Sequence, residues 1–195
     1  MTFQFEAHVS EVASELTGTF SIGQSIFGSY AFDSEAVDTV SSNDIGAYAY
    51  DSFTFSIDSY TGSSSVGQIQ VSDDVASGAF DFYRVQNLRV PGGILADAVG
   101  AWTPIELSLQ LTDSTAMAFD TDALPLNPPD MADFPDFRGF RLSFAENPDA
   151  GPVVSLRGTV TSLSFAHVPE PSSGWLLAAG LAGLVARRRH RRANL

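Results

Sequence analysis

The sequence contains no cysteine and no lysine, and it has only three histidines. The lack of cysteine excludes disulfides, thiolate nucleophiles and thiolate metal sites. The histidines are His8, His167 and His190, and no two of them have metal-ligand spacing. A Ser-His-Asp triad would have to use His8 or His167, since His190 lies in an arginine run, and we interpret both as surface or structural histidines.

Compact catalytic motifs are also missing. The chain has no Gly-x-Ser-x-Gly elbow, no phosphate-binding loop and no dinucleotide fingerprint. Carboxylates are abundant, so counting residues leaves a glycosidase-type pair open. We predict a protein that is not an enzyme and has no cofactor, and we rank an envelope hydrolase with a carboxylate pair last among the alternatives.

Basic residues are scarce before residue 168. This part has 22 acidic residues and five arginines, a net charge of −17. Such a surface repels phosphate backbones. The composition therefore predicts that nucleic acid is not a partner.

A long hydrophobic run is lacking as well. The apolar run Trp175–Ala186 has twelve residues without a charge, about 18 Å as a helix against the roughly 30 Å hydrocarbon core of a bilayer. Its faces are all apolar or glycine, which disfavours a soluble amphipathic helix. Arginine stems reaching to the headgroups and local thinning of the bilayer can make up the difference in length.

Five arginines follow the run directly: Arg187, Arg188, Arg189, Arg191 and Arg192. Arginines beside a span stay on the cytoplasmic side of the membrane. We therefore expect residues 175–195 to be a short hydrophobic helix with an arginine stop, and the preceding residues to face outward.

Immediately before the helix the chain reads Val168, Pro169, Glu170, Pro171. The two prolines favour extended backbone at these positions. An extended strip suits the cleft of a processing enzyme, and a stiff linker that holds the domain away from the bilayer is the alternative. We assign residues 167–174 to this linker.

Together, the Pro-Glu-Pro element, the short hydrophobic helix and the terminal arginine cluster resemble the PEP-CTERM sorting domain of exported proteins from Gram-negative bacteria. The resemblance covers residues 168–195. It implies recognition by an exosortase, a membrane-embedded cysteine transpeptidase, and processing near Pro169–Pro171. It also implies export to the cell envelope or outside the cell, with transient membrane anchoring, in bacteria that produce exopolysaccharide.

The first residues carry none of the features of a signal peptide. Met1 to Val9 alternates apolar and polar residues without a basic or apolar leader segment. This pattern predicts a β-strand, and we expect a signal peptide to be encoded upstream.

Residues 1–166 are predicted to form one β-domain, since the apolar pattern has a period of two. The clearest strands are Phe3–Val9, Phe53–Ile57 and Ile105–Thr112. Weaker candidates are Leu16–Ile22, Ile26–Phe32, Val66–Val71, Phe80–Val85, Phe140–Phe144 and Val154–Phe165. About nine or ten short strands predict an antiparallel β-sandwich or jelly roll. A closed barrel is the alternative.

Irregular segments are predicted between the strands. Turn-forming residues gather at Ser41–Asp44, at Thr61–Ser65, at Pro91–Gly93 and in the long Asp120–Asp136 loop. In the last strand the apolar positions change from even numbers (Val154, Leu156, Val160) to odd numbers (Leu163, Phe165), and this parity switch beside Gly158 indicates a bulge or a bend.

Two ligand sites follow as hypotheses. Asp120, Asp122, Asp130, Asp133 and Asp136 share one loop and could supply oxygen ligands for Ca²⁺, although solvated turn aspartates are the commoner meaning of such a loop. Adjacent Asp73 and Asp74 would point to opposite faces of a strand. Five aromatic residues could form a sugar-stacking platform: Tyr48, Tyr50, Tyr60, Tyr83 and Trp102. Alternatively, Tyr48 and Tyr50 are cross-strand packing partners on an ordinary sheet.

We therefore expect a non-enzymatic exported β-domain with a structural or exopolysaccharide-matrix role. Its expected partners are an exosortase-type enzyme, the membrane through the C-terminal helix and an exopolysaccharide. A glycan-binding module at the cell surface is the first alternative.

Overall fold

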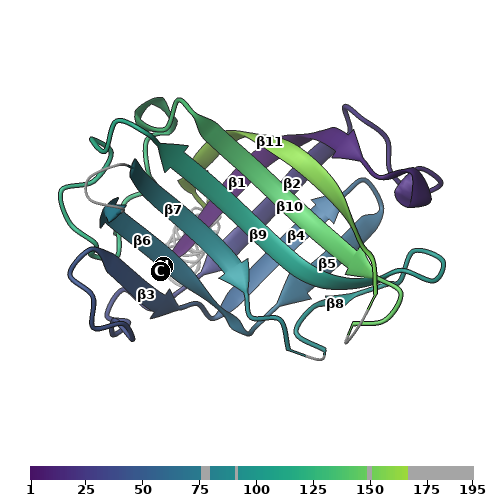
Figure 1. The fold of residues 1–195 in the computed structure, drawn as a ribbon, viewed down its shortest axis with the longest axis horizontal. Coiled ribbons are helices and arrows are strands. Elements are labelled where there is room, and N and C mark those ends of the chain that lie inside the picture. Colours follow the sequence, from purple (N-terminus) through teal and green to yellow (C-terminus); the bar gives the residue numbers. More distant parts are fainter. Residues whose placement is uncertain (76–79, 91, 149–150, 167–195) are drawn as a thin grey trace, which may run out of the picture.

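The computed structural model describes residues 1–75, 80–90, 92–148 and 151–166. These residues form an 11-stranded sheet in which every hydrogen-bonded pair of strands is antiparallel. The strand order is β3-β6-β7-β9-β10-β11-β1-β2-β4-β5-β8 (Figure 1). The strands are β1 Thr2–Val12, β2 Ser25–Ala31, β3 Ile45–Ala49, β4 Ser52–Ile57, β5 Tyr60–Ser64, β6 Gly67–Asp74, β7 Phe80–Asn87, β8 Leu95–Ala96, β9 Thr103–Asp113, β10 Phe137–Ala145 and β11 Val153–Phe165. Two 3₁₀-helices, η1 Ser14–Leu16 and η2 Met131–Asp133, lie in the connections.

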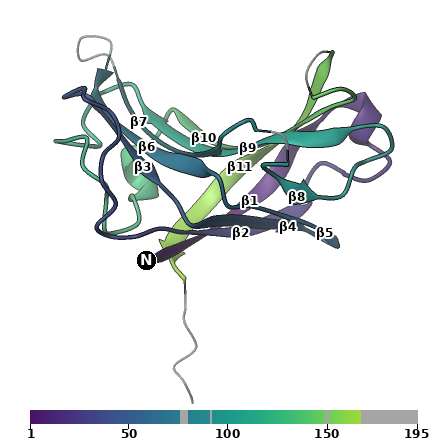
Figure 2. The same cartoon turned by 90° about the horizontal axis from the view of Figure 1, so that it is seen from below.

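The sheet curls on itself into a half-barrel, so that its two ends face each other (Figure 2). We call β3, β6, β7, β9, β10 and β11 the front limb, and β1, β2, β4, β5 and β8 the rear limb. The prediction of an all-β antiparallel fold is confirmed. The two separate sheets of a sandwich or jelly roll are corrected to one curled sheet, because periodicity reports which face of a strand is buried but not which strands pair.

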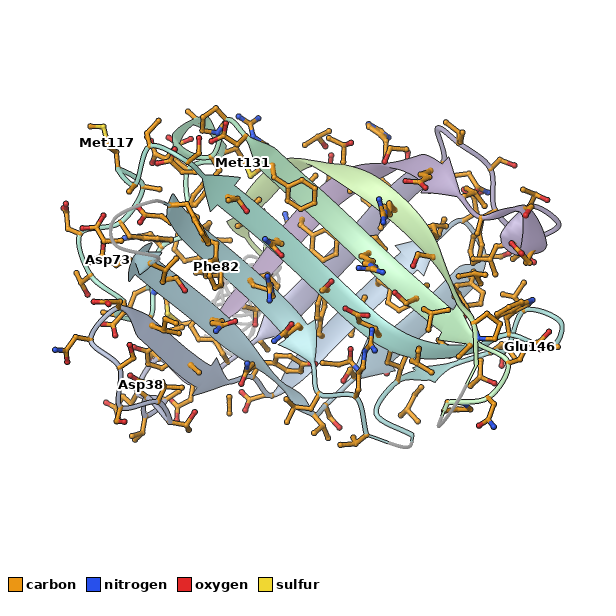
Figure 3. The ribbon with its side chains drawn as sticks, viewed as in Figure 1. Asp38, Asp73, Phe82, Met117, Met131 and Glu146 are labelled. Carbon is orange, nitrogen blue, oxygen red and sulfur yellow. The ribbon has the colours of Figure 1, made fainter. Side chains whose placement is uncertain are left out.

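The hydrophobic core lies between the limbs. Leu107, Leu109 and Leu111 of β9 are fully buried, as the alternation predicted. The Phe140 ring of the front limb packs on Phe5 of the rear limb, with ring centroids 5.8 Å apart. Alternation therefore leaves a polar outer face on the front limb, which Figures 1 and 3 turn toward the viewer.

Two predicted segments differ from the structure. The predicted strand Leu16–Ile22 is wrong: η1 ends at Leu16, and the Phe20 amide donates to the Leu16 carbonyl. The buried side chains of Leu16 and Phe20 in this tight turn gave the apolar spacing that we had interpreted as a strand. The predicted turn at Thr61–Ser65 lies largely within β5, where Gly62 packs closely against the Phe55 ring and Ser64 is buried.

The predicted irregularity in the last strand is confirmed. Ser162 pairs with Glu6 and Val160 with Ala7, so that Thr161 is an extra residue in β11. This bulge changes the parity of the apolar residues. The sequence had placed the irregularity beside Gly158, and the bulge lies three residues further along the chain, at Thr161.

The described chain ends beside its beginning. Phe165 pairs with Phe3, and the Ala166 amide donates to the Thr2 carbonyl at 3.0 Å. The linker 167–174 and the hydrophobic helix with its arginine tail, 175–195, lie outside the described residues. Within residues 1–166 as described, no helix has the length and apolar character needed to cross a membrane.

Candidate functional site

The predicted aromatic platform belongs mostly to the core. Tyr83, Tyr50 and Tyr48 expose 0%, 4% and 7% of their surface, Tyr60 is half-buried, and its ring packs 5.0 Å from that of Phe20. The packing alternative is therefore correct for Tyr48 and Tyr50, and Tyr83 also lies in the core, whereas Tyr60 and Trp102 are half-buried beside the core. Burial was hidden from the sequence because tyrosine occurs on both faces of a sheet.

Of the histidines, only His8 lies in the described part of the chain. It is exposed on β1, with Thr159 of β11 and Ser25 of β2 at the paired positions. His167 and His190, like the sorting motif and the arginine stop, fall outside the described residues.

Two aspartates of the predicted Ca²⁺ loop, Asp130 and Asp136, have different partners. Asp130 caps η2 by accepting a hydrogen bond from the Ala132 amide at 2.9 Å. Asp136 accepts one from the Ser114 amide at 2.6 Å. The Asp130 contact is typical of a turn aspartate, whereas Asp136 joins its loop to the turn after β9.

A different acidic group forms where β6 meets β7. Oxygens of Asp73, Asp74 and Asp81 lie within 4.8 Å of one another (Asp73 is labelled in Figure 3). Asp74 has a φ of 54°, which breaks the strand alternation expected to separate it from Asp73. Burial raises the pKa of Asp73, and the charges of Asp74, Asp81, Asp120 and Asp122 raise it further.

Asp81 is already engaged within this group. One carboxylate oxygen accepts from the Asp74 amide at 2.8 Å and the other from the Phe119 amide at 2.9 Å. This buried side chain therefore fixes the loop that follows β9. The group is a hard-oxygen cluster of the kind that can hold a cation, built from residues that the sequence analysis had not combined.

The arginines before residue 168 gather on the outer face of the front limb. Four of the five line a groove of about 720 Å³ across β7, β9, β10, β11 and β1, and nitrogen-bearing side chains crowd this face in Figure 3. We call it the arginine groove. Its lining residues include Arg84, Arg138, Arg141, Arg157, Gln86, Gln110, Ser108, Thr159, Phe137, Glu11, Glu106 and Asp136.

Strand register arranges the groove in two rows. One row runs Arg84, Gln110, Gly139, Thr159 from β7 to β11. The next row runs Gln86, Ser108, Arg141, Arg157 and ends at Glu11 on β1. Each row crosses the strands and carries polar side chains, except at Gly139, because paired residues on antiparallel strands share a face.

Neutral oxygens hold three of the guanidinium groups in place. The Nε of Arg84 donates to Gln110 Oε1 at 2.9 Å, that of Arg138 to the Phe134 carbonyl at 2.7 Å, and that of Arg141 to Ser143 Oγ at 3.1 Å. The guanidinium of Arg84 also lies 5.0 Å from the centre of the Phe82 ring. Within the described residues, none of these three arginines forms an ion pair with a carboxylate, although the charge of Glu106 acts on Arg84.

Burial lowers the pKa of the Arg84 guanidinium, and nearby Glu106 raises it. The Arg84 guanidinium is thus partly removed from water, and an anion beside it stabilises its positive charge. A guanidinium remains charged in proteins, so the groove keeps this cation at neutral pH.

Two acidic residues of the groove pair with arginines. Arg157 contacts Glu11 at 3.3 Å between two well-exposed side chains, and Arg89 forms an ion pair with Glu106. Exposed ion pairs of the first kind contribute little stability.

An exposed aromatic ring completes the groove. Phe137 exposes 52% of its surface, and a Cβ on Gly139 would lie 2.3 Å from its ring. The ring therefore lies across Gly139, and any larger residue at this position would displace the ring. A flat apolar surface thus sits beside the guanidinium groups.

Sequence reasoning missed this groove, although a signal was present. Arg84, Arg138, Arg141 and Arg157 lie in strongly alternating strands of a lysine-free acidic domain. Their assembly depended on the strand order, which brings β7 and β11 within two strands of β10.

Comparison with known proteins gave one match. No curated protein and no solved structure matches the chain. Residues 167–192 match the family model described as the PEP-CTERM protein-sorting motif, which confirms the resemblance found in the sequence. The chain is thus an all-β protein that carries a PEP-CTERM protein-sorting motif in residues 167–192.

Proposed function

We propose that this chain is a non-enzymatic protein of the cell envelope or the extracellular space, with a structural role in an exopolysaccharide matrix. The observation that carries the proposal is the sorting motif at residues 167–192. In this proposal the hydrophobic helix holds the exported domain at the membrane until an exosortase-type enzyme acts near Pro169–Pro171.

The β-domain supports this role through its construction. Its core is closed by aromatic packing between the limbs, and this packing is not supplemented by disulfides because the chain has no cysteine. The chain leaves the domain at Ala166, beside β1, only a few residues before the proposed processing site.

The experiment compares the full-length protein with a variant in which Pro169, Glu170 and Pro171 are replaced by alanine. Both are expressed in their native cells with the upstream coding sequence, and each fraction is analysed by intact mass. We expect the unchanged protein to lose a few kilodaltons and leave the membrane fraction, whereas the variant keeps its full mass there.

A matched control replaces Ser172 and Ser173 by alanine, which changes the same linker but spares the prolines. This control is expected to be processed normally. Identical masses and identical membrane retention for the unchanged protein and the Pro-Glu-Pro variant would contradict processing and leave a plain membrane anchor.

A further inference from the structure

We propose that the arginine groove binds an acidic polysaccharide, a chain of sugars that carry carboxylate groups. The proposal deepens the matrix role and rests on it for the location of the ligand, but the binding itself is a property of the groove.

The first argument is the placing of like charges. Arg141 and Arg157 occupy directly paired positions on β10 and β11. Like charges at such positions destabilise a sheet. The ion pair with Glu11 offsets the charge of Arg157 only weakly, because both side chains are more than half exposed. An anion between the two guanidinium groups would remove the repulsion.

The second argument is the availability of donors. Arg84 and Arg138 use only their Nε atoms in the hydrogen bonds found among the described residues. Their terminal nitrogens thus remain for a ligand. A guanidinium group held in one orientation presents two parallel N–H donors, which matches the two oxygens of a carboxylate.

The third argument concerns the sugar ring. The exposed Phe137 ring offers an apolar surface, and the C–H face of a sugar packs on such a ring. Ser108, Gln110 and Thr159 place hydroxyl and amide groups in the same groove. Stacking, neutral hydrogen bonds and guanidinium groups together fit a carboxylated sugar better than a simple anion.

The charge of the lining separates this ligand from denser polyanions. Glu11, Glu106 and Asp136 also line the groove, and the chain before residue 168 has a net charge of −17. A double-stranded nucleic acid, which carries a charge about every 1.7 Å along its axis and presents only acceptor oxygens on its phosphates, is repelled. Sugar hydroxyls, in contrast, can donate hydrogen bonds to these carboxylates.

The test is isothermal titration of the purified full chain with an oligogalacturonate of defined length, with the methyl-esterified oligomer as the uncharged counterpart. We expect the oligomer with free carboxylate groups to bind, and we expect binding to be lost when these groups are esterified. The variant Arg84→Gln/Arg141→Gln is expected to bind about tenfold more weakly or worse, since each removes charge-assisted hydrogen bonds.

The matched control is Arg188→Gln/Arg191→Gln, which changes the net charge equally but in the tail. It is expected to keep the affinity within about twofold, because those arginines belong to the sorting tail and supply none of the contacts on which the proposal rests. Thermal unfolding checks that each variant is folded. Should the double groove variant not fold, Phe137→Ala removes only a half-exposed ring and is expected to weaken binding several-fold.

Several results would overturn the proposal. The first is that the methyl ester binds as tightly as the carboxylate oligomer. The second is that the tail control weakens binding as much as the groove variant does. The third is that the carboxylate oligomer does not bind. Tighter binding of poly-glutamate would assign the groove to an acidic protein segment instead. None of these outcomes changes the mass and fractionation result, so that failure of the groove and failure of the sorting proposal are distinguishable.

Discussion

At the scale of single residues, charge placement decides the local stability of this acidic chain. Asp73 is the clearest case, because its carboxylate is half-buried among four other acidic residues. A carboxyl group whose pKa is raised in the folded state favours folding while it is protonated. This contribution is present below the unfolded pKa, near 3.9, and is lost as the pH rises through the folded pKa.

We therefore expect Asp73→Asn to stabilise the protein at pH 7 by on the order of 0.5–1 kcal/mol. The gain is expected to disappear below about pH 4, where the unchanged carboxyl is protonated. Thermal unfolding at both pH values measures the effect, with exposed Asp51→Asn as the control. A loss of stability at pH 7 in Asp73→Asn would contradict the repulsion.

At the scale of elements, buried carboxylates end strands and shape the loops after them. Asp113, the last residue of β9, is buried and accepts hydrogen bonds from the amides of Thr115 and Met117, each at 2.9 Å. Burial acts to raise the pKa of Asp113, but these hydrogen bonds outweigh burial and hold the pKa below its usual value. The ionised carboxylate therefore stabilises the loop that follows the strand.

Asp113→Asn is expected to lower stability at pH 7 by about 1–3 kcal/mol, because charge-assisted hydrogen bonds are lost in a buried place. A depressed pKa gives stability that is present above the unfolded pKa and lost as the pH falls through the folded pKa. The difference between the two proteins should thus shrink in acid. Chemical unfolding at pH 7 and at pH 3 measures both, and an equal difference at the two pH values would argue against the carboxylate.

At the scale of the whole molecule, contacts between the limbs close the curled sheet. The Tyr83 hydroxyl of β7 donates to the Tyr30 hydroxyl of β2 at 3.0 Å, and both residues are fully buried. This hydrogen bond joins strands that lie on different limbs of the sheet. Burial raises the pKa of both hydroxyls, so each favours the fold as the neutral phenol.

Tyr30→Phe leaves the Tyr83 hydroxyl without its acceptor and is expected to cost about 1–3 kcal/mol. Adding Tyr83→Phe removes the hydroxyl that has lost its acceptor. The double variant is therefore expected to lose less free energy of unfolding than the sum of the two single variants. A double-mutant cycle by urea unfolding measures this coupling. Additive losses would show that the hydrogen bond does not couple the limbs.

The same pair predicts the response to alkali. A raised tyrosine pKa gives stability that is present below about pH 10 and lost as the pH rises through the folded pKa. The double phenylalanine variant is therefore expected to lose less stability between pH 9 and pH 11 than the unchanged protein.

The sequence alone determined the features that depend on local order. Alternation in Ile105–Thr112 identified β9 and its buried leucines, and the parity switch predicted an irregularity in the last strand, although beside Gly158 and not at Thr161. The sorting motif was also readable, because its three parts are contiguous and their meaning lies in their order along the chain.

Only the tertiary structure decided what distant segments do together. Pairing made one curled sheet from strands that the pattern had assigned to two, turned Tyr48, Tyr50 and Tyr83 inward, and set Asp81 beside Asp73. It also placed Arg141 opposite Arg157 and laid Phe137 across Gly139 to form the arginine groove. Strand pairing depends on contacts between residues far apart in sequence, whereas periodicity records only which side of each strand avoids water.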